Sequence, residues 1–523
     1  MTKDTSPVPA HPTPPIAYQE AVRLPLPLVE GHKEYREREA TLRRIDELLV
    51  DSGVESSFVS HHVALEKMKV NSCGGVLSDR RLETVSLHAR RTLRCMIASL
   101  LSNSSYRDFS NHLAESSLLQ WFCHYNMLAG IRPPSKSTLQ RMSESTSSEV
   151  INQLMRQLVG AAQETDEDGR STLGLAQAID LSCVWIDTTC AALNIHFPTD
   201  WVLLRDGVRS IMRTIATIRS HGLFHRMPDP ASIVRSINGL AMAMSSASRR
   251  GRGCNKKRQR KQTLRAMKKV ANKAIQHAER YSAKVRSQWQ ETDLTDAQKE
   301  RLANRLDEIV ALMPQAIHQA HERIIGERPV PNAVKILSLY QPHAKVYVRG
   351  KSGADTEFGL QLLVAESVDG LILDCTVTAD GVANDTKLLV PTMKRLQENF
   401  GSCAPTACVT DRGFSSASNS QALDELGIED HTFPRSMTQS NARLADDSDD
   451  FAQLQRRRAQ TEARIGVFKA NFLGSRIPVK SLKAQLCHVA WSTLAHNVWV
   501  LARRDVVEES EDQDDPGELR QAG

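Results

Sequence analysis

The spacing of hydrophobic residues predicts helices in the first third of the chain. Between residues 80 and 165, apolar side chains recur every three or four positions, as in amphipathic helices. The first such stripe consists of Leu82, Val85, Leu87, Leu93, Met96 and Leu100. A set of arginines accompanies it and predicts a basic surface: Arg80, Arg81, Arg90, Arg91 and Arg94. The pattern fits either a helix-turn-helix module or a plain bundle that supports the rest of the protein.

Three sequence signals mark the starts of helices. The segments 105–108, 137–140 and 295–298 resemble capping boxes, with Ser105, Ser137 and Thr295 as the hydroxyl residues. The last of them opens a helix with the apolar residues Leu302, Leu306, Ile309, Met313 and Ile317. We expect this helix to kink at Pro314 and to pack against the preceding helix as an antiparallel pair.

Strand-like segments lie on both sides of this helical region. Residues 181–196 alternate between apolar and polar positions, which predicts a strand or a hairpin. Further strands are predicted at 345–349, 357–364, 371–377 and 407–410, with a helix that begins at Asp385 before the last one. The chain is therefore predicted to be α/β, with a sheet core interrupted by a helical insertion and preceded by an all-α region.

A further helix is predicted from Leu454 to Arg476. Arg458, Glu462 and Lys469 are four and then seven residues apart, which places them on one helical face. A carboxylate is thus held between two cations. The spacing fits either an exposed ion pair or a functional site, and the helix alone does not decide between them.

Two aspartates occupy strand-like settings that favour a functional role. Asp187 lies among β-branched residues and Asp411 ends a short apolar strand. Asp374 and Asp380 are the chief competitors for the site, although Asp380 before a glycine is more typical of a turn. Asp200 is more simply explained as a helix N-cap.

Charge is unevenly distributed along the 523 residues. The net charge is +6, but the segment 505–518 holds eight acids and no base, which leaves 67 bases against 53 acids in the remainder. Such a basic body is expected to meet polyanions. No apolar run is long enough to span a bilayer, no secretory signal is present, and the ten scattered cysteines are expected to be reduced.

The densest basic block lies between residues 249 and 269. It contains no acid, and its bases are Arg249, Arg250, Arg252, Lys256, Lys257, Arg258, Arg260, Lys261, Arg265, Lys268 and Lys269. A block of this density repels itself unless a polyanion lies against it. We interpret it as a clamp on a DNA phosphate backbone, with a solvated helix as the alternative.

The order of these motifs resembles the DDE transposases of bacterial insertion sequences (ISNCY-like). The matching segments are 186–189 with 195–200, 410–414, and the spacing Arg458-x3-Glu462-x6-Lys469. Similar elements carry a tyrosine three residues before that arginine, where this chain has Gln455, so a tyrosine role is not carried over. The resemblance covers residues from about 80 to about 500.

The resemblance implies a ribonuclease-H-like core in which two Mg²⁺ or Mn²⁺ ions are held by Asp187, Asp411 and Glu462. Asp187 would bridge both ions, and Asp411 and Glu462 would hold one each. Lys469 would contact a phosphate beside the cut, and Arg458 would steady Glu462 or the DNA backbone. The implied reaction is cleavage at the ends of the element, followed by transfer of the 3′ hydroxyl into target DNA.

The expected organisation has five parts. They are a Pro-rich leader at 1–35, a helical DNA-binding region at 36–170, a catalytic core at 175–206 and 335–500, a basic helical insertion at 207–334, and an acidic tail at 503–523. The expected partners are double-stranded DNA, both terminal inverted repeats and target, and further copies of the chain in a homodimer or larger assembly. The expected location is the cytoplasm, at the nucleoid and not in a membrane. Alternatives are a related nuclease that does not join DNA and an inactive DNA-binding protein.

Overall fold

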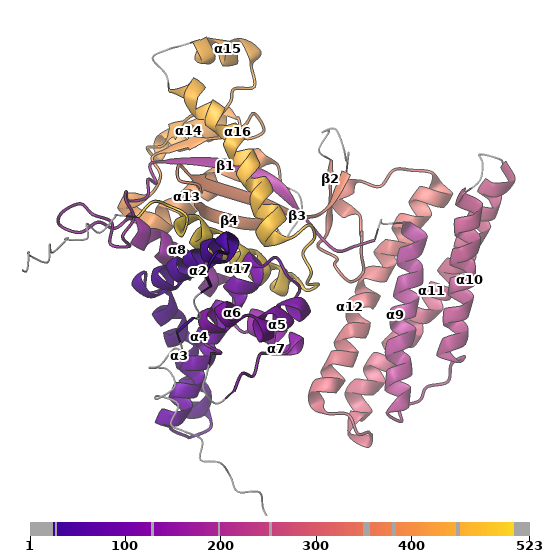
Figure 1. Ribbon diagram of the computed structural model, residues 1–523. Coiled ribbons are helices and arrows are strands. Elements are labelled where there is room, and N and C mark those ends of the chain that lie inside the picture. Colours follow the sequence, from indigo (N-terminus) through magenta and orange to yellow (C-terminus); the bar gives the residue numbers. More distant parts are fainter. Residues whose placement is uncertain are drawn as a thin grey trace, which may run out of the picture.

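The computed structural model describes residues 25–26, 29–126, 130–196, 199–249, 254–348, 356–378, 383–445 and 450–506. Most of the predicted leader and nearly all of the predicted acidic tail lie outside these residues. Figure 1 shows a helical region below a central sheet and a separate bundle of long helices beside them.

A mixed sheet forms the centre of the molecule. Its strands are β1 Cys183–Ala192, β2 Lys345–Val348, β3 Thr356–Ser367, β4 Ile372–Thr378, β5 Ala407–Val409 and β6 Glu429–Asp430. Their order is β2-β3-β1-β5-β6, and β4 also pairs with β3. β3 is antiparallel to β1 and β4, whereas β5 is parallel to β1 and β6 to β5. This arrangement is that of a ribonuclease-H-like sheet and confirms the predicted fold class.

The C-terminal helices cover the sheet. They are α13 Leu389–Phe400, α14 Ala417–Glu425, α15 Met437–Ala445, α16 Phe451–Phe468 and α17 Leu482–Leu501. α16 packs across β1 and β5, while α13 and α17 contact β4. Asn497 fixes α17 to the sheet, because its side chain accepts from Ile372 N–H at 2.9 Å and donates to Ile372 C=O at 2.8 Å. α16 packs instead against β1, which carries Asp187, and against β5, which ends shortly before Asp411.

The N-terminal helices share one hydrophobic core with the sheet. They are α2 Lys33–Asp51, α3 Val54–Ser72, α4 Asp79–Leu101, α5 Tyr106–Glu115, α6 Ser117–Phe122, α7 Lys136–Ser143 and α8 Ser148–Gln163. α17 contacts α2, α4, α7 and α8, and Phe58 meets the buried Trp491 at 5.8 Å between ring centroids. Since one continuous apolar cluster links both regions, these helices support the sheet.

The predicted basic surface on α4 is wrong at Arg94, and two of the other arginines form ion pairs with neighbouring helices. Arg94 is fully buried, and its guanidinium pairs with Glu55 at 2.5 Å and also with Asp46. Arg90 pairs with Glu55 at 3.6 Å, and Arg81 pairs with Glu66 at 2.6 Å. These arginines join helices to one another, because acids on α2 and α3 face them across the helix packing.

Two of the three predicted helix caps are confirmed. Ser105 accepts from Asp108 N–H, and Thr295 forms a capping box with Gln298. The prediction at Ser137 is wrong, because Ser135 caps α7 two residues earlier. A serine at either position can cap a helix, so the path of the preceding chain decides whether Ser135 or Ser137 is the N-cap.

The insertion is a four-helix bundle with its own hydrophobic core. Its helices are α9 Asp200–Ser220, α10 Pro230–Arg249, α11 Cys254–Gln288 and α12 Asp296–His321, and α11 packs on α12 as expected. Pro314 lies inside α12. Short 3-10 turns lie at Trp289–Glu291, Asn332–Val334, Asp385–Lys387 and Gly401–Cys403, and π turns lie at Glu322–Gly326 and Lys469–Leu473.

Asp200 has a different role from the predicted N-cap. Thr199 occupies the N-cap position of α9, and the Asp200 carboxylate is buried. It accepts hydrogen bonds from Gln319 at 2.8 Å and from Arg323 at 2.9 Å. The prediction was wrong because the partner cation lies on a distant helix, so Asp200 joins the start of α9 to the end of α12.

The strands that precede and follow the bundle, β1 and β2, pair with opposite edges of β3. Ala192 of β1 and Lys345 of β2 both pair with Gly359 of β3, on opposite edges of that strand. A Cβ at Gly359 would lie 2.1 Å from the Ala191 carbonyl oxygen, so this close approach requires glycine. The bundle therefore leaves and rejoins the sheet at neighbouring points.

Among the residues that the structure describes, no helix is both long and apolar enough to cross a membrane. The cysteines whose side chains it describes are free thiols, including the pair Cys403 and Cys408.

Candidate active site

Asp187 lies in the middle of β1, opposite Val364 of β3. Its carboxylate accepts a hydrogen bond from the Thr188 N–H at 2.7 Å. Burial raises the pKa of Asp187 to about 6; the Thr188 N–H opposes this shift, and the charges of Asp411 and Glu462 add to it. Asp187 therefore lies within electrostatic range of both other predicted site acids.

Asp411 follows the end of β5, the strand parallel to β1. Its Oδ1 accepts from the Gly413 N–H at 2.8 Å, which orients the carboxylate. A Cβ at residue 413 would lie 2.9 Å from Asp411 Oδ1 and 3.0 Å from Asp385 Oδ2. Gly413 thus leaves room for two carboxylates that approach each other from different segments.

Glu462 reaches the same region from α16. As predicted, it pairs with Arg458 one turn earlier, with 3.1 Å between Arg458 Nη2 and Glu462 Oε1. The Glu462 side chain is 43% exposed, so this pair is solvent-accessible. An accessible carboxylate can change its rotamer to meet a ligand, which a fully buried one cannot do as easily.

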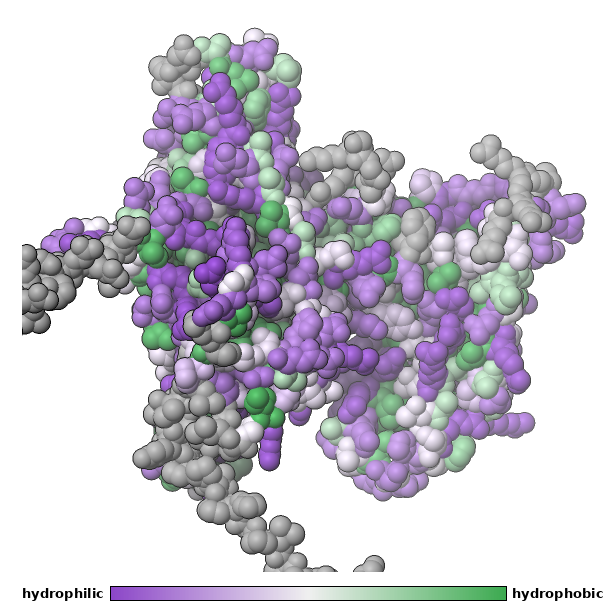
Figure 2. All heavy atoms as spheres, viewed as in Figure 1, coloured by the Kyte–Doolittle hydropathy of each residue, from purple (hydrophilic) through white to green (hydrophobic). Residues whose placement is uncertain are grey.

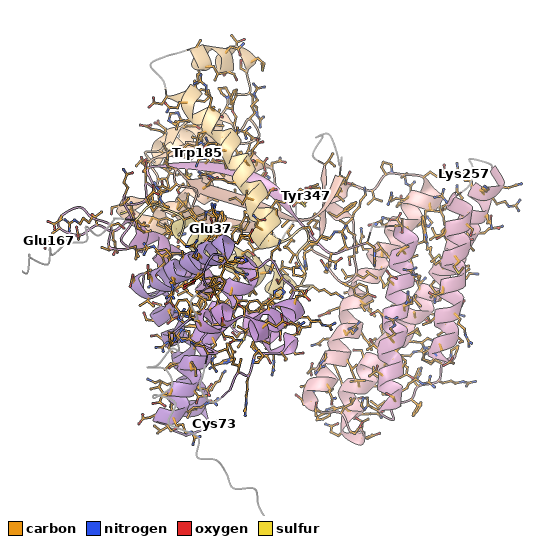
Figure 3. All side chains as sticks on the ribbon, viewed as in Figure 1. Glu37, Cys73, Glu167, Trp185, Lys257 and Tyr347 are labelled. Atoms are coloured by element: carbon orange, nitrogen blue, oxygen red, sulfur yellow. The ribbon has the colours of Figure 1, made fainter. Side chains whose placement is uncertain are left out.

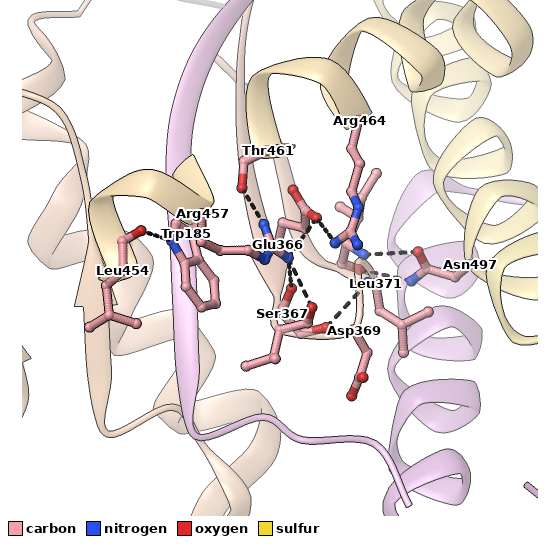
Figure 4. A network of polar contacts seen from close by, with 12 residues as sticks. Trp185, Glu366, Ser367, Asp369, Leu371, Leu454, Arg457, Thr461, Arg464 and Asn497 are labelled. Atoms are coloured by element: carbon pink, nitrogen blue, oxygen red, sulfur yellow. Dashed lines mark hydrogen bonds and ion pairs between the residues drawn. The ribbon is translucent and has the colours of Figure 1, made fainter. Parts of the chain in front are cut away.

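A buried network docks α16 on the sheet (Figure 4). Arg457 lies over the Trp185 ring at 4.4 Å and donates to Glu366 at 3.2 Å and to the Val368 carbonyl at 2.9 Å. Arg464, two turns later, donates to the same Glu366 oxygen at 2.6 Å. Since Glu366 is 2% exposed and belongs to β3, these pairs set the position of the helix that carries Glu462.

Lys469 departs from the straight helix that the sequence predicts. α16 ends at Phe468 and continues as a π turn over Lys469–Leu473. The wider turn directs the Lys469 ammonium towards β1, where it donates to Thr189 Oγ1 at 3.2 Å. The Lys469 ammonium thus contacts β1 at Thr189, two residues after Asp187.

Asp187, Asp411 and Glu462 line one cavity of about 720 Å³. Its walls come from β1, β2, the segment 383–386, the segment after β5, and α16. Within the described part of the chain, no group of three or more acidic, histidine or cysteine side chains is close enough together to hold a metal ion. The structure thus brings the three acids to a common cavity, but not into a closed ligand set.

Asp385 is a fourth acid in this cavity, and sequence reasoning treated it only as the start of a helix. It accepts hydrogen bonds from the Thr188 hydroxyl at 3.0 Å and from Gln361 at 3.4 Å. Burial raises its pKa, and the nearby charge of Asp411 raises it further. No local pattern pointed to Asp385, because Thr188 and Gln361, which bind its carboxylate, lie far away along the chain.

The two rivals named from the sequence do not take this place. Asp374 pairs with Arg395 at 2.6 Å and does not line the cavity. Asp380 lies outside the described residues.

Gln455 occupies the position where similar elements have tyrosine. Its amide donates to the Thr410 carbonyl at 3.3 Å and to the His431 carbonyl at 2.7 Å. It therefore ties the first turn of α16 to the residue before Asp411, which is a structural use and not contact with a substrate.

Part of the predicted basic block is neutralised within the bundle. Lys257 and Lys261 each pair with Glu327 at 2.6 Å, and the two lysines lower the pKa of Glu327 to about 2. Lys268 contacts His321 at 3.0 Å. Lys256, Arg258, Arg260, Arg265 and Lys269 have no acidic partner among the described residues, whereas Arg250 and Arg252 lie outside them. Figure 3 places Lys257 on the side of the bundle away from the sheet.

Comparison with known proteins identifies one domain. Residues 335–498 match the family profile described as transposase DDE domain. The match runs from the segment before β2 into α17, so it includes Asp385, Asp411, Glu462 and Lys469 but not β1 and its Asp187. It does not assign the chain to the ISNCY-like group. No curated protein and no solved structure matches the chain.

Proposed function

We propose that this chain, which carries a transposase DDE domain at residues 335–498, cleaves phosphodiesters at the ends of an insertion sequence and transfers the 3′ hydroxyl into target DNA. One observation carries the proposal. Asp187 comes from a strand outside the matched segment, yet it lines the same cavity as Asp411 and Glu462. An acid on β1, an acid after the parallel β5 and an acid on a C-terminal helix are the set that the resemblance to DDE transposases implies for metal-dependent phosphoryl transfer.

The donor set suits divalent cations. Asp187, Asp411 and Glu462 offer carboxylate oxygens, the ligands that Mg²⁺ and Mn²⁺ prefer. Two bound ions would activate the attacking hydroxyl and neutralise charge on the leaving oxygen. Asp187, Asp411 and Glu462 would hold these ions, and the raised pKa of Asp187 fits a group of acids that needs a cation among them.

The cations near the three acids have two kinds of role, contact with the substrate and positioning of α16. Lys469, held near Asp187 by Thr189, would meet a phosphate beside the cut. Arg458 would keep Glu462 oriented through their ion pair until a ligand takes its place. The guanidiniums of Arg457 and Arg464 are positioning groups, since they hold α16 on β3 without lining the cavity.

The substrates in this proposal are double-stranded DNA with the terminal inverted repeats and the target DNA. Pairing of two ends requires a homodimer or a larger assembly of the chain on DNA, acting in the cytoplasm at the nucleoid. The cations of the basic block that have no acidic partner among the described residues, such as Lys256 and Arg258, would bind the DNA backbone irrespective of sequence.

The test is a set of single amide substitutions, Asp187→Asn, Asp411→Asn and Glu462→Gln, with Asp424→Asn as a matched control. Asp424 is an exposed acid on α14 that does not line the cavity. With Mg²⁺, each site variant should lose both cleavage and joining of end-containing DNA while retaining DNA binding, and the control should retain all three. Cleavage by any site variant would defeat the assignment. Cleavage without joined products by the unaltered protein would identify a nuclease, and binding with neither reaction an inactive DNA-binding protein.

A further inference from the structure

A second cleft lies where the bundle meets the sheet. Its volume is about 290 Å³, and it is lined by residues 194–196 beyond β1, the first half of α9, Tyr340 and Lys480. We call it the junction cleft. Hydrophilic residues cover much of the visible face where the bundle and the core adjoin (Figure 2). The cleft is separate from the cavity that holds Asp187, although both are reached along β1.

The junction cleft carries an excess of positive charge. Arg205, Arg209 and Arg213 line it from α9 at four-residue spacing, so they follow one face of the helix, about 6 Å apart along its axis. Lys480, an exposed residue of the core, also lines the cleft. Both the bundle and the core therefore contribute cations to it.

These charges are not balanced locally. Asp206 is the one acid among the described lining residues, and it already pairs with Arg205 at 2.8 Å. Arg209, Arg213 and Lys480 have no acidic partner in the part of the chain that the structure describes. Arg209 is half-buried in a concave setting, where low-dielectric walls strengthen the attraction for a polyanion.

We propose that the junction cleft binds the phosphate backbone of DNA on one side of the cut, which rests on the proposed function. β1 leads directly from one site to the other: seven residues separate Asp187 from Asn194, or about 23 Å of extended chain at most. At about 3.4 Å per base pair, this corresponds to phosphates up to roughly seven base pairs from the scissile bond. The bundle would thus lengthen the DNA-binding surface beyond the catalytic cavity.

The first experiment measures binding. The double variant Arg209→Ala/Arg213→Ala is compared with Arg301→Ala, an exposed arginine of α12 that does not line the cleft. Fluorescence anisotropy with an end-containing duplex at several salt concentrations gives the slope of log K against log salt. The slope should flatten by about two in the double variant, since each lost phosphate contact removes about 0.9. The control variant should keep the wild-type slope, and unfolding midpoints should show that each protein is folded.

The second experiment locates the contact. Neutral methylphosphonates are placed one at a time along the duplex. Those up to roughly seven positions from the cut should weaken binding of the wild-type protein severalfold and leave the double variant unaffected. Equal sensitivity of both proteins at every position, or an unchanged salt slope, would overturn the inference and leave the arginines as surface charges of the bundle.

The two proposals fail separately. Binding needs no chemistry, so a wild-type protein that binds but does not cleave refutes the proposed reaction while the cleft remains testable. A wild-type protein that cleaves, with unchanged binding in the double variant, refutes the cleft alone.

Discussion

Arg464 donates a hydrogen bond of 2.6 Å to Glu366, and this contact joins the helix that carries Glu462 to the central sheet. Arg457 donates to the same Glu366 oxygen from the other side. The third acid of the cavity therefore depends for its position on an ion-pair network that does not itself touch the cavity.

Replacing Glu366 with alanine should destabilise the protein, because it leaves two cations without their carboxylate. Both arginines are partly exposed, so we expect a loss of about 2–4 kcal/mol in the free energy of unfolding. Chemical denaturation measures this value. Glu425→Ala, at an exposed acid of α14, should stay within about 0.5 kcal/mol of wild type. Equal effects of the two substitutions would contradict the role assigned to Glu366.

The raised pKa of Asp187 predicts a pH-dependent stability in the absence of divalent ions. Its folded pKa of about 6 lies above the ordinary value of 3.8, so the folded state binds more protons between these values. Stability is therefore lost as pH rises through this window, by about 3 kcal/mol at full ionisation. Asp187→Asn should be more stable than wild type at about pH 8 and indistinguishable at about pH 4. Thermal unfolding at both pH values checks this, and a gap that does not change with pH would refute it.

Gly413 and Gly466 provide a matched pair of substitutions. A Cβ at Gly413 would lie within about 3 Å of both Asp411 and Asp385, whereas nothing lies within 4 Å of a Cβ at Gly466 in α16. Gly413→Ala should displace the carboxylates and abolish most cleavage with Mg²⁺. Gly466→Ala should retain cleavage and stabilise the helix by about 0.5–1 kcal/mol. Cleavage assays and denaturation of both variants separate these effects; full activity of Gly413→Ala would show that the two carboxylates need not be close.

The basic block should divide into free and neutralised cations. Lys256→Ala/Arg258→Ala removes charges without an acidic partner among the described residues and should flatten the salt dependence of DNA binding by about two. Glu327→Gln should have the opposite effect, since it releases Lys257 and Lys261 to bind phosphates. Anisotropy titrations at several salt concentrations measure both slopes. If neither variant differs from wild type, the block does not touch DNA.

The sheet and the three acids of the cavity could be predicted because each depends on local sequence. The alternation around Asp187 and the short apolar strand before Asp411 indicate strands, and the spacing of Arg458 and Glu462 indicates a helix face. The order of these motifs along the chain then indicated a ribonuclease-H-like sheet. The confirmed ion pair between Arg458 and Glu462 needs no tertiary information, because it forms within one turn.

The remaining features depend on contacts between distant segments. Asp385 joins the cavity because Thr188 and Gln361, far away in sequence, bind its carboxylate. Arg94 is buried because acids on two other helices neutralise it, although its local pattern is that of a surface arginine. The hydrophobic periodicity of a segment predicts which of its faces is buried, but it does not predict which distant residues pack against that face.

The single glycine at position 359 determines how the bundle is attached. Since the chain leaves β1 and re-enters at β2 on the two edges of β3 at this residue, the attachment points are only about 10 Å apart. A short loop could span that gap, and closing a longer connection adds little entropic cost. Loss or exchange of the four helices would therefore leave the strand order intact. Under the proposed function, the length of DNA that the chain covers can change without altering the catalytic cavity.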